Sequence, residues 1–261
     1  MLTQVLQPHR PGARLSLDDA LAEPPAGLPH KDKLDAAHQA LTERLEQLQS
    51  ALGAEAQRAL LVVLQGRDAS GKDGTIRGVF GGLNPALCRV TSFKAPTLTE
   101  LQHDYLWRVH QAVPPRGTIG LFNRSHYEDV IAVRVHRLAA EPVWRRRFDH
   151  LNAFERMLSD EGVVIRKFFL HISKEEQRRR LEERLSNPAK NWKFQRGDLE
   201  ERQRWDDYTA AYEEVLERCS TDYAPWYVVP ADKNKARDYL VAEVLVRTLE
   251  LMNPQYPPAD P

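Results

Sequence analysis

Hydrophobic and polar residues follow two patterns along this chain: short continuous apolar runs, and longer segments with an apolar stripe. The clearest run is ALLVVL at 59–64, which a glycine follows closely. Short runs of this kind are typical of central parallel strands that are covered on both faces. Further strands are predicted near 89–93, 118–122, 163–170 and 226–229.

Segments with helical spacing separate these runs. The first carries apolar residues on one helical face, namely Leu34, Ala37, Leu41, Leu45, Leu48 and Leu52. The other predicted helices are 72–82, 98–112, 142–161, 174–186, 199–219 and 233–252. Because strands alternate with helices, we expect the α/β class, with a parallel central sheet and helices on both faces.

The first thirty residues have a different character. They contain Pro8, Pro11, Pro24, Pro25 and Pro29. Proline fixes φ and lacks a backbone N–H, so residues 1–30 are predicted to form an extended arm. Residues 31–261 are predicted to form one domain, which the length of 261 residues suits.

Composition excludes several classes of protein. Apolar residues make up 42% and charged residues 28%, which argues against disorder of the whole chain. No apolar run approaches the roughly 20 residues that span a bilayer, and the N-terminus lacks the features of a signal peptide. Cys88 and Cys219 are interpreted as reduced core thiols. We therefore expect a cytoplasmic protein without a membrane partner.

Charge is balanced over the whole chain, with 37 Lys and Arg residues against 37 Asp and Glu residues. A site for a polyanion must therefore arise from a local concentration of charge. The neutral balance and the lack of a recognised reader motif argue against a nucleic-acid partner.

A phosphate-binding loop is predicted directly after the run 59–64. Two glycines with four residues between them precede a lysine, and a predicted helix follows. Backbone N–H groups and the helix dipole of such a loop attract anions, and the lysine adds a mobile charge. The predicted phosphate-binding residues are Gly66, Ala69, Ser70, Gly71, Lys72, Asp73 and Gly74. The alternative is a glycine-rich turn that binds no ligand.

The loop departs from the usual pattern at one position. Asp73 follows Lys72, where a Ser or Thr normally binds Mg²⁺. Asp68 is the obvious substitute, because Mg²⁺ prefers carboxylate oxygen. A carboxylate inside a phosphate cradle repels phosphate unless a cation lies between them. We therefore predict a Mg²⁺ site at Asp68, which Mn²⁺ could occupy in place of Mg²⁺. The alternative role for Asp68 is that of a turn residue.

A second group of polar residues, NRSHYED at 123–129, follows the run 118–122. Ligands of open α/β sheets lie at the carboxyl ends of strands, so Arg124 is placed to bind phosphate oxygens. Glu128 and Asp129 offer oxygens for Mg²⁺ or a base, and Glu128 is the preferred metal ligand. The alternative is an ordinary helical turn whose acids oppose the dipole. His126 is interpreted as a packed or hydrogen-bonded histidine.

Basic residues concentrate in and after the helix 174–186. They are Arg178, Arg179, Arg180, Arg184, Lys190, Lys193 and Arg196. Guanidinium groups on a closing segment neutralise charge during phosphoryl transfer. Arg178 and Lys193 are the preferred candidates. The alternative is a solvated face with pairs such as Glu175 with Arg179.

Several motifs together resemble the second family of polyphosphate kinases, P-loop enzymes related to thymidylate kinases. They are GRDASGKDG at 66–74, SFKAP at 92–96, NRSHYED at 123–129, KNWKF at 190–194 and WDDY at 205–208. The resemblance covers about residues 30–250 and implies a three-layer α/β/α sandwich with a helical lid at about 174–200. It also implies reversible transfer of a terminal phosphoryl group between inorganic polyphosphate and a nucleotide, with Mg²⁺.

The resemblance assigns roles to individual residues. Asp68 is implied to bind metal and Lys72 to be the loop lysine, while Arg124 clamps phosphate. Arg178 and Lys193 are implied to be lid cations. Asn123 stands where many members carry Asp, and Glu128 stands where those members carry Asn. This combination resembles that of the branch accepting nucleoside mono- and diphosphates. Glu128 would then help to hold Mg²⁺ or position the monophosphate.

The expected partners follow from the same resemblance. They are inorganic polyphosphate and adenine nucleotides, AMP and ADP, with guanine nucleotides as a second choice, and the chain is expected to form a homo-oligomer. Candidates for a basic polyphosphate track are Lys94, Arg77, Arg134 and Arg137, with Lys94 preferred. Two alternatives remain open: an ATP-dependent nucleotide or nucleoside kinase, and a P-loop protein that binds without catalysis. The combined set of metal ligands and phosphate clamps argues against the second.

Overall fold

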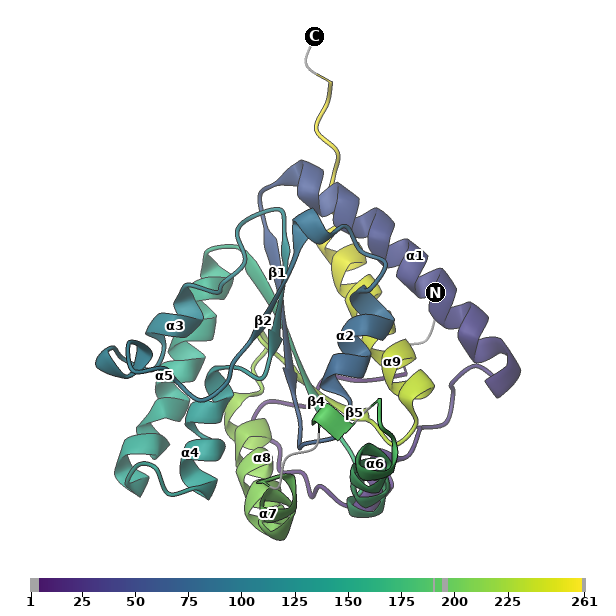
Figure 1. Cartoon of the computed structure of the whole chain (residues 1–261). Helices are drawn as coiled ribbons and strands as arrows, with labels where there is room; N and C mark the ends of the chain where they lie inside the picture. Colours follow the sequence, from purple (N-terminus) through teal and green to yellow (C-terminus); the bar gives the residue numbers. More distant parts are fainter. Residues whose placement is uncertain (1–4, 190, 194–196, 260–261) are drawn as a thin grey trace.

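A parallel β-sheet forms the centre of the computed structural model, which describes residues 5–189, 191–193 and 197–259 (Figure 1). The strands are β1 (Ala59–Gln65), β2 (Cys88–Ser92), β3 (Ile119–Asn123), β4 (Val163–His171) and β5 (Trp226–Pro230). Their order is β2-β3-β1-β4-β5. Leu60 of the central strand pairs with Ile119 on one side and Val164 on the other. The predicted strands and their parallel arrangement are confirmed.

Three helices cover one face of the sheet (Figure 1). They are α1 (Lys31–Glu55), α2 (Lys72–Phe80) and α9 (Asn234–Met252). Leu60 and Val62 of β1 point into this layer, where they share one apolar core with Leu45 of α1 and Leu245 of α9. Because α9 lies between the sheet and α1, most of its side chains are buried.

The opposite face is covered by a second helical layer. Its members are α3 (Trp107–His110), α4 (Ala132–Val135), α5 (Glu141–Asp160) and α8 (Trp205–Cys219). Leu61 and Val63, which alternate with the residues facing the first layer, pack here against Phe148 of α5 and Val215 of α8. The two cores confirm the three-layer α/β/α sandwich.

The remaining elements lie mainly at the loops around the sheet. The lid predicted at about 174–200 contains α6 (Lys174–Ser186), the 3-10 turn η5 (Asn191–Lys193) and the start of α7 (Gly197–Gln203). Figure 1 places α6 and α7 beyond the ends of the strands. The other 3-10 turns are η1 (Asp19–Ala22), η2 (Pro85–Leu87), η3 (Glu100–Gln102) and η4 (His126–Asp129).

The N-terminal arm packs against the domain. Between residues 5 and 30 it contains the turn η1 and otherwise bends and extended backbone. Leu17 and Ala22 are buried. The N–H of His9 donates to the carbonyl of Trp226, and the N–H of Asp232 donates to that of Ala22. The arm therefore contributes to the core, and the boundary near residue 30 stays a prediction.

Two predicted helices were wrong in extent. Residues 98–112 hold only the short turns η3 and α3, because Asp104 Oδ1 accepts a hydrogen bond from the N–H of Leu106 at 2.9 Å and competes with the helical pattern. The single helix expected at 199–219 is interrupted at Arg204. After this break, Trp205 lies beneath the phosphate loop, with the Arg67 guanidinium carbon 4.0 Å from its ring centre.

Two expectations drawn from composition can be compared with the structure. Cys88 and Cys219 are both free thiols, as predicted; Cys219 is buried in one core, whereas Cys88 is half-buried against the other. Burial raises the pKa of Cys88 to about 11 and the pKa of Cys219 to about 12, so neither is activated as a thiolate. None of the helices in the described ranges has the length and apolar composition that crossing a bilayer requires.

Candidate active site

The site lies where two neighbouring strands send their connections to opposite faces of the sheet. β1 continues into α2 on one face, whereas β3 continues through η4 and α4 towards α5 on the other. Such a divergence opens a crevice at the carboxyl ends of the strands. A cavity of about 1540 Å³ occupies this position. The phosphate loop and the segment 123–129 both border it, as the sequence predicts.

The phosphate loop needs glycine at position 71. Gly71 has φ 103°, in the left-handed region that glycine adopts without strain, and α2 begins at the next residue. A Cβ atom at this position would lie 1.9 Å from Arg237 Nη1. The backbone conformation therefore requires glycine here, and a side chain would in addition displace the guanidinium of Arg237.

Lys72 folds back over the loop. Its Nζ donates to the carbonyl of Gly66 at 2.8 Å and to that of Arg67 at 3.2 Å. Burial lowers the pKa of Lys72 to about 8, and the charge of Arg124 acts in the same direction. The ammonium group is thus charged at neutral pH and is positioned to exchange a carbonyl partner for a phosphate oxygen.

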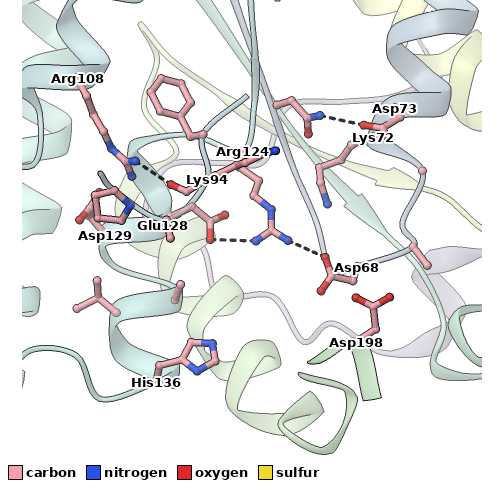
Figure 2. Close-up of a pocket in the computed structure, with 18 of the residues that line it drawn as sticks. Asp68, Lys72, Asp73, Lys94, Arg108, Arg124, Glu128, Asp129, His136 and Asp198 are labelled. Atoms are coloured by element: carbon pink, nitrogen blue, oxygen red, sulfur yellow. Dashed lines mark hydrogen bonds and ion pairs between the residues drawn. The ribbon is translucent and has the colours of Figure 1, made fainter. Parts of the chain in front are cut away.

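Arg124 joins the two carboxylates that the sequence marks as metal ligands. Its guanidinium donates to Asp68 Oδ1 at 2.6 Å and to Glu128 Oε2 at 3.3 Å (Figure 2). Glu128 raises the pKa of Arg124 above its ordinary value against the effect of burial. The backbone of Arg124 is left-handed, with φ 61°, which is uncommon for a residue with a side chain. The two acids and the clamp therefore meet at one point of the cavity.

The carboxylate oxygens at this site fit a metal ion that the substrate also helps to bind. Among residues 5–189, 191–193 and 197–259, no three His, Cys, Asp or Glu side chains are grouped to hold an ion by themselves. Mg²⁺ commonly takes one or two carboxylates and completes its shell with water and substrate phosphates. Asp68 and Glu128, both bordering the cavity, match that requirement.

Most of the predicted site residues meet in this cavity. Those that line it are Asp68, Ala69, Gly71, Lys72, Asp73, Gly74, Lys94, Arg124 and Glu128. Asp73 Oδ1 accepts a hydrogen bond from Asn123 Nδ2 at 3.0 Å, so this pair links the loop to β3. Gly66 lies at the base of the loop, and Ser70 is fully buried within it.

The lid residues are arranged differently from the prediction. Arg178 does not line the cavity; it is exposed and forms ion pairs with Glu175 and Glu182 at 2.5 and 3.3 Å. Arg180 lines it instead, and its Nη1 donates to the carbonyl of Ala69 at 2.9 Å. Lys193 belongs to the turn η5, and its side chain lies outside the described part of the structure. The position of Arg178 does not support its predicted role as a lid cation.

Helical phase explains why the sequence did not distinguish Arg178 from Arg180. Gln177 and Leu181 form the buried face of α6. At 100° per residue, Arg178 and Arg180 flank that face on opposite sides, so the spacing alone does not distinguish them. Arg184 lies on the same side as Gln177 and Leu181, and it also lines the cavity. Its orientation could have been recognised from the sequence.

Two further residues of the cavity were not assigned from the sequence. Arg237 comes from α9, far along the chain, and its Nη1 donates to Asn234 Oδ1 at 2.6 Å. Asp129 was considered with Glu128 but not preferred. Its Oδ1 accepts from Arg147 at 3.2 Å, while burial raises the pKa of Asp129 to about 6 against the opposing charge of Arg147. No local pattern around Arg237 indicates its place beside Gly71.

The crevice, the loop at the end of β1 and the facing arginine define a phosphotransferase of the P-loop kinase class. The family profile described as Polyphosphate kinase 2 (PPK2) matches residues 29–257. Because this match spans most of the chain, the protein belongs to the polyphosphate kinase 2 family, and the resemblance seen in the sequence is confirmed.

Individual relatives agree with this assignment. A protein of Meiothermus ruber named AMP/ADP-polyphosphate phosphotransferase is 60% identical over 217 residues, which are 83% of this chain and 81% of that protein. An ADP-polyphosphate phosphotransferase of Rhodopseudomonas palustris is 47% identical over 231 residues, 84% of this chain and 80% of its own. The crystal structure of polyphosphate kinase 2 from Arthrobacter aurescens TC1 superposes with a TM-score of 0.90 at 38% identity, covering 99% of this chain and 95% of that one.

Proposed function

We propose that this protein transfers the terminal phosphoryl group of inorganic polyphosphate to AMP and to ADP, and that the carboxylates of Asp68 and Glu128 would hold the Mg²⁺ that the transfer uses. The observation that carries this proposal is a single cavity with two different walls, both of which face Lys72 and Arg124. One wall is rich in arginine, and the other combines apolar and aromatic groups with a few cations. The name of the Meiothermus ruber relative supports the same pair of acceptors.

The arginine-rich wall suits the polyphosphate donor. It is formed by α2, α6 and α9, and its cations are Arg77, Arg179, Arg180, Arg184 and Arg237. Four of these pair with acids: Arg179 and Arg180 with Glu176 at 2.6 and 2.7 Å, Arg184 with Asp198 at 3.1 Å, and Arg237 with Asp238 at 2.8 Å. A chain of phosphates requires such a row of cations along its length, because each unit carries about one charge. Of the four track candidates, Arg77 and Lys94 border the cavity, on opposite walls.

The opposite wall suits the nucleotide acceptor. It combines apolar and aromatic groups with a few cations, and its members include Phe93, Lys94, Tyr105, Arg108, Val133, His136 and Leu138. Sites for small organic ligands typically join apolar surface to a small number of polar groups. The cations of this wall would bind the nucleotide phosphates, while the apolar groups would contact the nucleoside.

Transfer between these walls needs little from the protein beyond position and charge. A phosphate oxygen of the acceptor forms a bond to the terminal phosphorus of the donor, and the bond from that phosphorus to the next bridging oxygen breaks. The donor leaves one phosphate shorter, and the acceptor oxygen carries its own negative charge, so no base is required. Lys72 and Arg124 stabilise the charge that spreads over the transferred oxygens. Bound Mg²⁺ would neutralise further charge on the same oxygens.

The decisive assay supplies AMP or ADP with polyphosphate and Mg²⁺ and omits ATP. We expect ADP from AMP and ATP from ADP, with no product after chelation of the metal. Transfer from ATP but never from polyphosphate would overturn the proposal and favour an ATP-dependent nucleotide kinase.

Asp68→Asn is the matched variant for this assay. It keeps the size of the side chain and removes its charge, so turnover should fall about 10²- to 10³-fold while the melting temperature stays near that of the wild type. Wild-type turnover in this variant would remove Asp68 from the site. Comparing rates with Mn²⁺ and with Mg²⁺ tests whether Mn²⁺ can replace Mg²⁺. Using GDP in place of ADP tests whether guanine nucleotides are acceptors. A cytoplasmic location and a homo-oligomer stay predictions from the sequence.

A further inference from the structure

A charged network is fully buried beneath the segment that carries Arg124 and Glu128. It joins Lys167 of β4, Glu155 of α5 and the pair His126 and Tyr127 of η4. Lys167, Glu155 and Tyr127 are 0% exposed and His126 is 1% exposed. None of the four lines the cavity, so the network lies outside the site described above.

The polar groups of the ion pair are fully satisfied. Lys167 Nζ has three donors, and they reach Tyr127 Oη at 2.7 Å, Glu155 Oε2 at 2.5 Å and the carbonyl of Cys219 at 2.6 Å. Glu155 Oε1 accepts from Tyr127 Oη at 2.8 Å and from His126 Nε2 at 3.0 Å. Burial opposes ionisation of Glu155, but Lys167 and His126 outweigh it and hold the pKa of that carboxyl below its ordinary value. An ionised carboxylate only accepts, so the histidine proton is on Nε2.

Stability alone does not explain such a network. Removing an ion pair from water is costly, and apolar residues of similar volume often stabilise a fold equally well or better. The directional hydrogen bonds of a buried polar network do, however, favour one arrangement of the parts that it joins. Here two of those parts, His126 and Tyr127, are consecutive residues immediately before Glu128.

The same segment is also held on its upstream side. The N–H of Arg124 donates to the carbonyl of Leu64 at 3.0 Å. Gln65 Nε2 donates to Ser125 Oγ at 3.1 Å, and that hydroxyl accepts from the N–H of Tyr127 at 3.2 Å. The left-handed backbone of Arg124 persists only where its surroundings enforce it. Contacts to β1 enforce it from one side and the buried network from the other.

We propose that Glu155 is a positioning residue for phosphoryl transfer. Through His126 and Tyr127 it holds η4 in place, and thereby keeps the Arg124 guanidinium and the Glu128 carboxylate directed into the cavity. Lys167 fixes the carboxylate of Glu155 in turn. This inference rests on the proposed function, because the geometry it preserves is that of the transfer site.

The test separates η4 from Glu155 without breaking the ion pair. The double variant His126→Phe with Tyr127→Phe removes both donors to Oε1 and leaves Lys167 with Glu155. We expect kcat to fall about 10- to 100-fold, with KM for AMP and polyphosphate changed less than about threefold, because displaced groups weaken the transition state more than ground-state binding. His126→Gln alone places an amide donor near Nε2 and should retain most of kcat.

Leu249→Ala provides the control for lost stability. Leu249 is 0% exposed in α9, on the opposite face of the sheet, and its truncation leaves a cavity far from η4. This variant should melt at a lower temperature and keep wild-type kcat well below that temperature. If the double variant also keeps wild-type kcat well below its own melting temperature, the network has a purely structural role. The proposal would then be wrong. Tyr127→Phe alone, the milder change, gives the same comparison should the double variant not fold.

A double-mutant cycle with Arg124→Lys identifies the residue through which Glu155 acts. If the network works by positioning Arg124, its disruption should reduce kcat less in the lysine background than in the wild type. Multiplicative losses would contradict the proposed route. Wild-type transfer from polyphosphate is measured first, so its absence would refute the proposed function, whereas an active wild type with unaffected variants refutes only this inference.

Discussion

Two of the regions that bring arginines to the cavity hold them in opposite ways. Arg124 comes from the segment after β3, which β1 and a fully buried ionic network fix from both sides. Arg180 comes from α6, of which only Gln177 and Leu181 are buried. That helix meets the phosphate loop through polar bonds, such as those from Gln177 Nε2 to the carbonyl of Asp68 at 3.0 Å and from Arg180 to Ala69.

The difference separates two electrostatic tasks. Groups that stabilise a developing charge are most effective when they are already in place and need not reorganise. Arg124 meets that condition. Segments with few buried apolar contacts open at low free-energy cost, and α6 is such a segment. We therefore expect Arg124 to govern the transfer step and the α6 arginines to govern the hold on the donor.

Arg124→Ala should have the largest effect. It removes the guanidinium between Asp68 and Glu128, and kcat should fall by about 10³-fold, the scale of a catalytic arginine. Arg146→Ala is the matched control, because Arg146 is exposed and its Nε donates only to a carbonyl of its own helix among the contacts described. Steady-state kinetics with AMP and polyphosphate measures both. A loss of less than tenfold at Arg124 would contradict the division of tasks.

The pH dependence of Lys72 should come next. Burial lowers its pKa to about 8, so the ammonium is charged below that pH and neutral above it, whereas Arg124 keeps its charge throughout. Above a pH of about 8, kcat/KM for polyphosphate should fall roughly tenfold per pH unit. Lys72→Arg should remove this fall, at some cost in rate. A flat wild-type profile between pH values of about 6 and 10 would show that the ammonium does not bind the donor.

Arg180→Ala should have a smaller effect and a different character. Its loss removes charge-assisted contacts to the donor, so KM for polyphosphate should rise about tenfold while kcat changes little. Arg180→Lys keeps the charge and should recover part of the affinity. Initial rates at varied polyphosphate concentration separate the two parameters. A fall in kcat equal to that of Arg124→Ala would place Arg180 in the transfer step as well.

Arg178→Ala should have the smallest effect. Its partners Glu175 and Glu182 are exposed, and exposed pairs on one helix contribute little. We expect both kcat and KM to stay within about twofold of the wild type. A tenfold loss would restore Arg178 to the lid role that the sequence indicated.

The sequence predicts the parts of this site whose chemistry is local. The phosphate loop and the segment 123–129 each follow an apolar strand, so both are predicted at the carboxyl ends of the strands, where Lys72 and Arg124 can meet. It does not predict which flank of α6 meets the loop, because that depends on the rotation of a packed helix. Nor does it predict Arg237 or Glu155, which reach their positions only through contacts between distant elements.

The central position of β1 also constrains how this chain folds. β1 pairs with β3 and β4, both of which follow it at long sequence separation. Synthesis proceeds from the N-terminus, so β1 has no strand partner until these segments have emerged from the ribosome. Closing such long loops is entropically unfavourable and slows folding. The nascent chain therefore acquires a structured phosphate loop late, and its early intermediates should neither bind nor be stabilised by polyphosphate.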